Sequence, residues 1–87
     1  MTDIIGTSNQ DVLKGGSGDD LILGLGGDDF LYGKDGNDTL KGGEGGDVIW
    51  GGDGDDRMVG DDDDDNLVSY GGRDVMLGGA GDDQFDI

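Results

Sequence analysis

A repeat of nine residues runs without insertion or deletion from residue 6 to residue 86, and it constrains the fold more than any other feature of the chain. The nine copies read GTSNQDVLK, GGSGDDLIL, GLGGDDFLY, GKDGNDTLK, GGEGGDVIW, GGDGDDRMV, GDDDDDNLV, SYGGRDVML and GGAGDDQFD. Residues 1–5 continue the same register as a partial copy. Such strict spacing indicates that each copy is one structural unit stacked on its neighbours. We therefore expect residues 1–87 to form a single repeat domain.

Three places of the repeat are nearly invariant. The eighth place is always apolar, and the first is Gly in every copy except one, where Ser69 replaces it. Gly at the first, second and fourth places indicates a turn that needs positive φ or a close backbone approach. Places six to nine are typical of a short strand with one inward side chain. The sixth place is always Asp: Asp11, Asp20, Asp29, Asp38, Asp47, Asp56, Asp65, Asp74 and Asp83.

The period predicts an all-β solenoid. Gly recurs too densely for a helix to propagate. If two copies form one coil of 18 residues, alternate copies stack on the same side, and two short parallel sheets enclose two inward rows. Stacked strands lie ~4.8 Å apart, so the rod would be about 20–25 Å long. The rows are Ile4, Ile22, Leu40, Met58, Met76 and Leu13, Leu31, Ile49, Leu67, Phe85.

The composition requires a source of stability other than the core. The net charge is −17, only 31% of the residues are hydrophobic, and 22 are Gly. Such a chain repels itself and buries too little apolar surface to offset its ordering entropy. A cationic partner is therefore expected. Nucleic acid and anionic membrane are poor partners for an acidic chain, and no apolar run is long enough to span a membrane.

The absence of His and Cys from the sequence narrows the chemistry. Disulfides, the usual zinc, copper, haem and iron–sulfur ligand sets, and catalysis by His or Cys are excluded. We expect no enzymatic activity. The stacked turns would instead align the sixth-place carboxylates in two files, where like charges need a counter-ion. Carboxylates and backbone carbonyls are hard oxygen donors, and calcium accepts six to eight of them in a more flexible geometry than magnesium does.

Several copies carry the family resemblance. The copies GGSGDDLIL, GGDGDDRMV and GGAGDDQFD match the nonapeptide GGxGxDxUx, in which U is apolar. The chain thus resembles the RTX, or haemolysin-type, calcium-binding proteins over nearly its whole length. The resemblance implies a right-handed parallel β-roll with calcium between the turns of copies i and i+2. Five stacked turns leave four gaps and four leave three, so at most seven ions are expected.

The resemblance also implies which residues bind calcium. They are the nine sixth-place Asp carboxylates and alternating carbonyl oxygens of the Gly-rich turns. The glycines expected to supply carbonyls are Gly15, Gly16, Gly18, Gly24, Gly33, Gly36, Gly42, Gly43, Gly45, Gly51, Gly52 and Gly54. Sites touching Gly6–Asp11 and Ser69–Asp74 depart most from the motif.

The function implied is a calcium-binding module that folds on binding the ion and stabilises a secreted protein. The family implies export by a type I secretion system, and residues 1–10 lack the features of a cleaved signal peptide. The alternative is a structural spacer or adhesin-type module that calcium makes rigid.

The remaining acids are expected to be mainly solvated. The run Asp61–Asp65 is predicted to be a solvated surface, with extra metal coordination as the alternative. The acids of the fifth place are also expected to be solvated, and the alternative is that they support the metal ligands from a second layer. These acids are Asp19, Asp28, Asp55, Asp64 and Asp82.

The outward strand positions form two apolar faces. One is predicted to hold Phe30, Tyr32, Val48, Trp50 and Val68, and the other Leu21, Leu23, Val59, Val75 and Leu77. Such side chains either stabilise neighbouring strands or form a contact surface. We expect a homo-oligomer to form in calcium, by end stacking of exposed strand edges or through the Phe30/Tyr32/Trp50 face.

Overall fold

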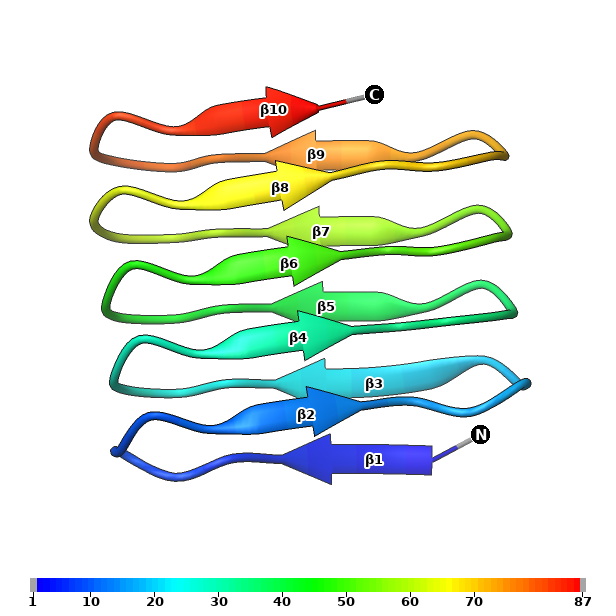
Figure 1. Ribbon diagram of the computed structural model, residues 1–87, viewed down its shortest axis with the longest axis horizontal. Coiled ribbons are helices and arrows are strands. Elements are labelled where there is room, and N and C mark those ends of the chain that lie inside the picture. The colour runs from blue at the N-terminus through cyan, green and yellow to red at the C-terminus, as the bar shows by residue number, and fades with distance from the viewer. Residues whose placement is uncertain (1, 87) are drawn as a thin grey trace.

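The structure is a computed structural model that describes residues 2–86, and it shows a flat stack of short strands joined by turns at both sides (Figure 1). None of the described residues is helical, so no membrane-spanning helix occurs among them. The strands are β1 (Thr2–Ile5), β2 (Val12–Lys14), β3 (Asp20–Leu23), β4 (Phe30–Tyr32), β5 (Thr39–Lys41), β6 (Val48–Trp50), β7 (Arg57–Val59), β8 (Asn66–Val68), β9 (Val75–Leu77) and β10 (Gln84–Asp86).

The strands form two parallel sheets, as the period predicts. One sheet has the order β1-β3-β5-β7-β9 and the other β10-β8-β6-β4-β2. Each residue pairs with the residue 18 positions further along, for example Ile22 with Leu40 and Leu31 with Ile49. The molecule measures 27 × 25 × 13 Å. The strands stack along the 25 Å direction, so the predicted β-roll and its predicted length are confirmed (Figure 1).

The core is a single layer of inward side chains between the sheets. Six of the ten predicted inward residues are completely buried: Ile22, Leu31, Leu40, Ile49, Met58 and Leu67. Ile4, Leu13 and Met76 are only partly buried against them. The prediction that Phe85 belongs to the core is wrong in degree, because its side chain is 50% exposed. A side chain in a terminal coil has a neighbouring coil on one side only, so burial decreases towards both ends of the stack.

The turns repeat one backbone conformation. From the third copy onward, the residues at the second and fourth places have positive φ, except Tyr70 at the second place of the eighth copy. Asp61 and Asp63 have φ of 74° and 71°, so they take the left-handed conformation that glycine takes elsewhere. Leu25 and Lys34 do so too, each at 71°. This conformation costs a non-glycine residue roughly 1–2 kcal/mol, which the stacking must offset.

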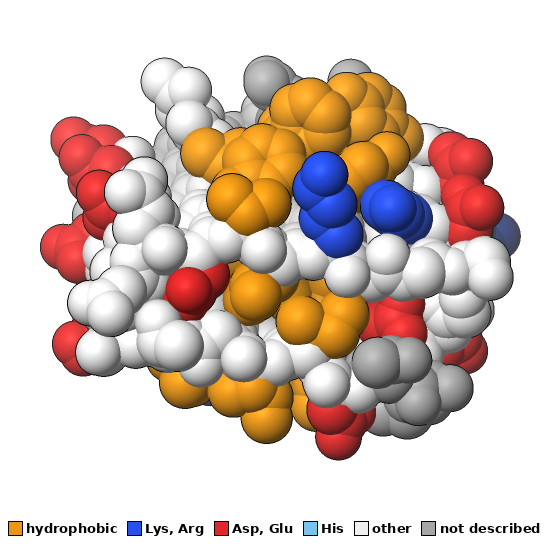
Figure 2. Space-filling model, turned by 60° about the horizontal axis from the view of Figure 1, so that its bottom comes forward, with side chains coloured by type: hydrophobic (Ala, Val, Ile, Leu, Met, Phe, Trp, Pro, Cys, Tyr) orange, Lys and Arg blue, Asp and Glu red, His pale blue; other side chains and the backbone are white. Residues whose placement is uncertain are grey.

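The outer faces of the sheets are mostly apolar with a few Lys and Arg side chains, and acidic side chains gather towards the turns on the two flanks in the view of Figure 2. Trp50 stands at the centre of an aromatic cluster on the β2/β4/β6/β8/β10 sheet. Its ring centroid lies 5.6 Å from that of Phe30 and 5.8 Å from that of Tyr32. Tyr70, a turn residue that the sequence did not place there, adds an edge-on contact at 5.9 Å. Such contacts stabilise neighbouring strands; self-association through this face stays a prediction.

The unequal burial of the inward row predicts unequal effects of truncation. We expect Ile49→Ala to destabilise the folded chain by about 2–5 kcal/mol, because it leaves a cavity in the core layer. Urea unfolding in calcium, followed by Trp50 fluorescence, measures the loss. Phe85→Ala is the matched control and should cost much less, since half of that side chain is exposed. Similar losses for both variants would show that the row is not buried as described.

Candidate metal centre

The turns align the sixth-place aspartates in two files, as predicted, and a ladder of hydrogen bonds connects each file. The Oδ1 of Asp38 accepts the backbone N–H of Asp20 at 2.7 Å, and the Oδ1 of Asp56 accepts that of Asp38 at 2.9 Å. Asp74 continues the file by accepting from Asp56 at 2.7 Å. The second file makes the same contact at 2.8–2.9 Å along Asp11, Asp29, Asp47, Asp65 and Asp83. In each pair, the residue later in the sequence lies in the upper coil of Figure 1. One oxygen of each upper carboxylate therefore accepts a hydrogen bond from the backbone of the turn below it.

The other carboxylate oxygen has no donor in the interior turns. The Oδ2 atoms of five aspartates are buried without a hydrogen-bond partner: Asp29, Asp38, Asp47, Asp56 and Asp65. These side chains are at most 3% exposed. An ionised oxygen that is removed from water without compensation is costly. Each of these oxygens thus calls for a cation or a proton.

Further oxygens face these carboxylates across the gap between stacked turns. A Cβ on Gly15 would lie 2.6 Å from the Oδ2 of Asp20 and 2.7 Å from the carbonyl oxygen of Gly33 in the next coil. A Cβ on Gly33 would meet Asp38 and Gly51 at the same two distances. The first place is therefore Gly because a carboxylate oxygen and the carbonyl oxygen of the next turn both lie against it.

Carbonyl oxygens also enter the gap from the turn below. Those of Leu25, Lys34 and Asp61 lie against the second-place glycines of the next coil. The fourth-place carbonyls of Gly18, Gly27, Gly36, Gly54 and Asp63 lie against the fourth-place glycines in the same way. The donor set of each gap is thus carboxylate plus backbone carbonyl, which suits a hard cation such as calcium.

Sequence reasoning identified most of these oxygens and missed some. Leu25, Lys34, Asp61 and Asp63 were not predicted, because Gly was taken as the mark of a turn carbonyl. Their place in the repeat was the available signal, since a carbonyl belongs to the backbone whatever the side chain. Gly27 and Gly78 were missed although they occupy the fourth and first places. The predicted carbonyls of Gly24, Gly33, Gly42 and Gly51 lie at first-place positions, and those of Gly43, Gly45, Gly52 and Gly54 lie in the positive-φ turns.

The first turn of each file departs from the others. Gly16 and Gly18 have neither positive φ nor a close neighbour at the Cβ position, although their copy matches the motif fully. The N–H of Gly16 donates to the Oδ2 of Asp20 at 2.8 Å, and that of Thr7 to the Oδ2 of Asp11 at 2.7 Å. No described turn lies beneath these two, so no carbonyl from below shapes their backbone. Their carboxylates are satisfied by their own turn instead.

Ser69 is the other departure. It is buried, and its Oγ donates to the Oδ2 of Asp74. The hydroxyl therefore provides the donor that the corresponding oxygen of the interior aspartates lacks.

Among residues 2–86, no three carboxylates converge as a metal-binding group. The residues fit a calcium ion on two observations: the orphaned buried Oδ2 atoms, and the oxygen-lined space at the first-place glycines.

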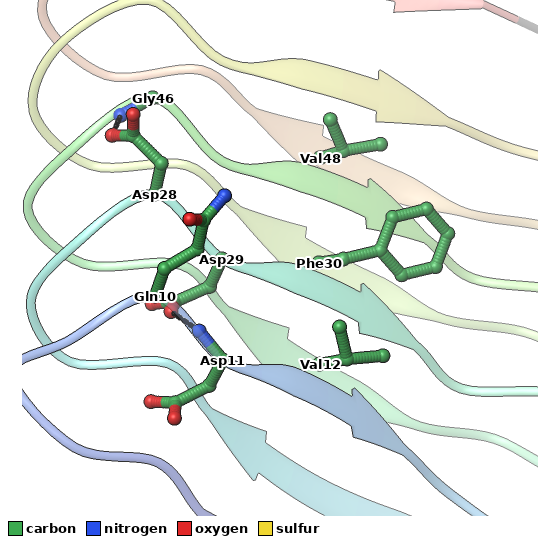
Figure 3. Close-up of a pocket in the computed structure, with 8 residues that line it drawn as sticks. All are labelled: Gln10, Asp11, Val12, Asp28, Asp29, Phe30, Gly46 and Val48. Atoms are coloured by element: carbon green, nitrogen blue, oxygen red, sulfur yellow. Dashed lines mark hydrogen bonds between the residues drawn. The ribbon is translucent and has the colours of Figure 1, made fainter.

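The fifth-place acids are exposed, as expected for solvated side chains, but four of them also make a contact that the sequence did not predict. Figure 3 shows this contact for Asp28, whose Oδ1 accepts the N–H of Gly46 in the next coil at 2.8 Å. Asp19, Asp55 and Asp64 make the equivalent contact at 2.7 Å. These side chains are exposed, but each one holds a backbone N–H of the turn above.

Figure 3 also shows a groove beside this turn edge, with a volume of about 450 Å³. Its lining combines turn residues with the outward side chains of three strands: Gln10, Asp11, Val12, Asp28, Asp29, Phe30, Gly46 and Val48. Asp11 and Asp29 belong to the sixth-place file, so the groove borders that file.

The acidic run has mixed roles. Asp62, Asp63 and Asp64 are exposed, as predicted for a solvated surface, whereas Asp65 is buried in its file. The Oδ2 of Asp63 accepts the N–H of Gly45 at 3.0 Å. Asp61 lies 3.8 Å from the Nζ of Lys41, an exposed pair that adds little stability.

Burial raises the pKa of the interior carboxyl groups. Desolvation is the largest cause, and neighbouring carboxylates of the same file add to it. The pKa rises from 3.8 to about 7 for Asp47 and Asp56 and to about 6 for Asp38 and Asp65. The pKa of Asp29 is raised as well. Without a metal ion, these carboxyl groups bind protons more readily than ordinary Asp side chains do. A proton and a cation would therefore compete for the same oxygens.

These shifts predict that acid promotes folding of the metal-free chain. A carboxyl group with a raised folded-state pKa contributes stability below its unfolded pKa of 3.8 and loses it as the pH rises through about 6–7. In calcium-free buffer, far-UV circular dichroism should show more strand at pH 5.0 than at pH 7.5. The exposed Asp62→Asn serves as control and should leave this dependence unchanged. Equal spectra at the two pH values would contradict the raised pKa values.

Comparison with known proteins identifies the repeat. A family model for the RTX calcium-binding nonapeptide repeat, spanning four copies at a time, matches residues 5–40, 32–67 and 59–86. Searches among curated proteins and among solved structures find no match. The three matched ranges cover almost the whole chain, in the register that brings the aspartates into files. The chain therefore belongs to the RTX calcium-binding nonapeptide-repeat family.

Proposed function

We propose that this chain is a calcium-dependent folding module whose β-roll forms when calcium enters the gaps between stacked turns. The observation that carries the proposal is the set of five buried Oδ2 atoms without a donor in a chain of net charge −17. The family supplies calcium as the expected ion. Bound calcium would supply the positive charge that these oxygens lack.

The proposed ligands follow the geometry of the gaps. The Oδ2 of the lower Asp and the first-place carbonyl of the upper turn would both face the ion. Carbonyls of the second and fourth places would complete the shell from below. Seven gaps set an upper limit of seven ions, four in one file and three in the other. The gaps that involve the two first turns are the weakest candidates, because Gly16 and Thr7 already donate to Asp20 and Asp11.

The proposed role is to keep the protein unfolded where calcium is scarce and to fold it where calcium is abundant. Secretion by a type I system would fit this role, because export would precede folding. Extracellular calcium modules bind with dissociation constants of about 10⁻⁴–10⁻³ M. A folding midpoint in that range would support an extracellular role, and a midpoint below about 10⁻⁷ M would contradict it.

The direct test is circular dichroism in chelator and in calcium. We expect a largely disordered chain in chelator and a β-rich chain in millimolar calcium, because binding free energy appears as folding free energy. Magnesium at the same concentration should substitute poorly, since it demands a tighter octahedron and retains its waters. A full strand spectrum in chelator at pH 7.5 would exclude a folding switch.

Interior and terminal turns should contribute unequally. Asp47 is 1% exposed, accepts the N–H of Asp29, and donates its own N–H to Asp65, so it faces a gap on each side. Asp83 is half-buried, and among the described residues its side chain accepts only the N–H of Asp65 below. We expect Asp47→Ala to raise the calcium midpoint of folding by more than Asp83→Ala does. The two variants have equal charge, so equal midpoints in a calcium titration would argue against ligands shared between gaps.

A further inference from the structure

The side chains at the fifth place of the repeat form a second ladder of hydrogen bonds. The family motif allows any residue at this place and gives it no role. In one file, the Oδ1 of Asp19 accepts the N–H of Asn37 at 2.7 Å, and the Oδ1 of Asn37 accepts the N–H of Asp55 at 2.8 Å. The Oδ1 of Asp55 then accepts the N–H of Arg73 at 2.7 Å. In the other file, Asp28 and Asp64 make the same contact to the next coil.

This ladder runs opposite to that of the sixth place. At the sixth place, the upper side chain accepts from the lower backbone, as Asp38 does from Asp20. At the fifth place, the lower side chain accepts from the upper backbone, as Asp19 does from Asn37. Two adjacent residues of one turn thus exchange hydrogen bonds with two adjacent residues of the next, which fixes their relative height and register.

Asn37 shows what the fifth place requires. It occupies the same position as Asp19 and Asp55 and makes the same contact with a neutral amide oxygen. Charge is therefore unnecessary for the contact, whereas a calcium ligand of the carboxylate type would depend on it. The oxygen that each of these side chains uses is already engaged by a backbone N–H.

We propose that the fifth-place Asp and Asn side chains are positioning residues that hold each turn on the next in the register required for calcium binding. They act as hydrogen-bond acceptors, a role that does not require charge, and do not coordinate the ion. The inference rests on the proposed function only for its calcium readout, because the ladder itself is a property of the folded chain.

Gly46 marks the place where the ladder is interrupted. Gly46 has no side chain that could accept the backbone N–H of Asp64 in the next coil. The two turns are connected instead by Asp63, whose Oδ2 accepts the N–H of Gly45. Gly46 does not have positive φ, so a side chain can be introduced there. Its Cβ would lie 3.0 Å from the carbonyl oxygen of Asp64, a tight contact that Asn and Ala would share.

The first experiment compares Asp55→Asn with Asp55→Ala in the full chain in calcium chloride. Both variants remove one negative charge, so their difference isolates the acceptor. We expect Asp55→Ala to speed amide hydrogen exchange at Arg73 about fivefold and to lower the melting temperature by roughly 5 °C. Asp55→Asn should stay close to wild type in both measurements, and its calcium stoichiometry by titration calorimetry should be unchanged.

The outcomes separate the possible roles. If Asp55→Asn is as damaging as Asp55→Ala and loses calcium, the side chain is a ligand and the proposal is wrong. If neither variant changes exchange at Arg73, the side chain is merely solvated and the proposal is also wrong. A wild-type chain that folds equally in chelator would refute the calcium switch, yet the two variants would still rank the hydrogen bond by exchange at Arg73.

The second experiment completes the ladder instead of breaking it. Gly46→Asn should lower the calcium midpoint and raise the melting temperature relative to Gly46→Ala, since both remove glycine flexibility and only Asn adds an acceptor. Amide exchange at Asp64 should slow in Gly46→Asn alone. Identical behaviour of the two variants would overturn the assignment of the fifth place as an acceptor position.

Discussion

The stacking of oxygen atoms against oxygen atoms in the turns is the constraint on which the rest of the structure depends. Each interior sixth-place carboxylate gives one oxygen to the backbone of the turn below and leaves the other facing carbonyl oxygens. Six fully buried apolar side chains are a thin core for 87 residues and cannot offset much repulsion. On the proposed function, the stability of the roll would therefore depend on whether a cation or a proton balances the carboxylates in the gaps.

Much of the fold could be predicted from the sequence because the period leaves little freedom. Nine residues per copy and an apolar eighth place determined the two inward rows, and every observed strand pair has the predicted offset of 18 residues. The files of Asp side chains follow from the same offset. The period could not predict how deeply each inward side chain is buried. The exposure of Phe85, for example, depends on how many coils cover it.

The parts of the site that escaped prediction depend on distances between coils. In the sequence, Asp28 and Asp55 have the character of surface acids. Their oxygens reach the N–H groups of Gly46 and Arg73 because the coils are stacked. Leu25 and Lys34 are poor candidates for positive φ by residue type, but they adopt it at the place of the repeat where other copies have Gly43 and Gly52. Tyr70 reaches Trp50 from a turn, which an analysis of strand faces does not consider.

The division of labour along the repeat explains how one chain can be so acidic and still form sheets. The described outward strand positions are mostly apolar, with Lys14, Lys41 and Arg57 among the few charges, while the acids gather in the turns (Figure 2). Strand pairing thus meets little repulsion of its own, and the cost of stacking is concentrated at the two flanks. In a solenoid each coil contacts only its neighbours, so a charge balanced in one gap favours pairing of the strands on either side and thereby forms the next gap. Folding and ion binding should consequently spread along the stack together, and the coils at the middle, which are flanked on both sides, should be the most stable part of the roll.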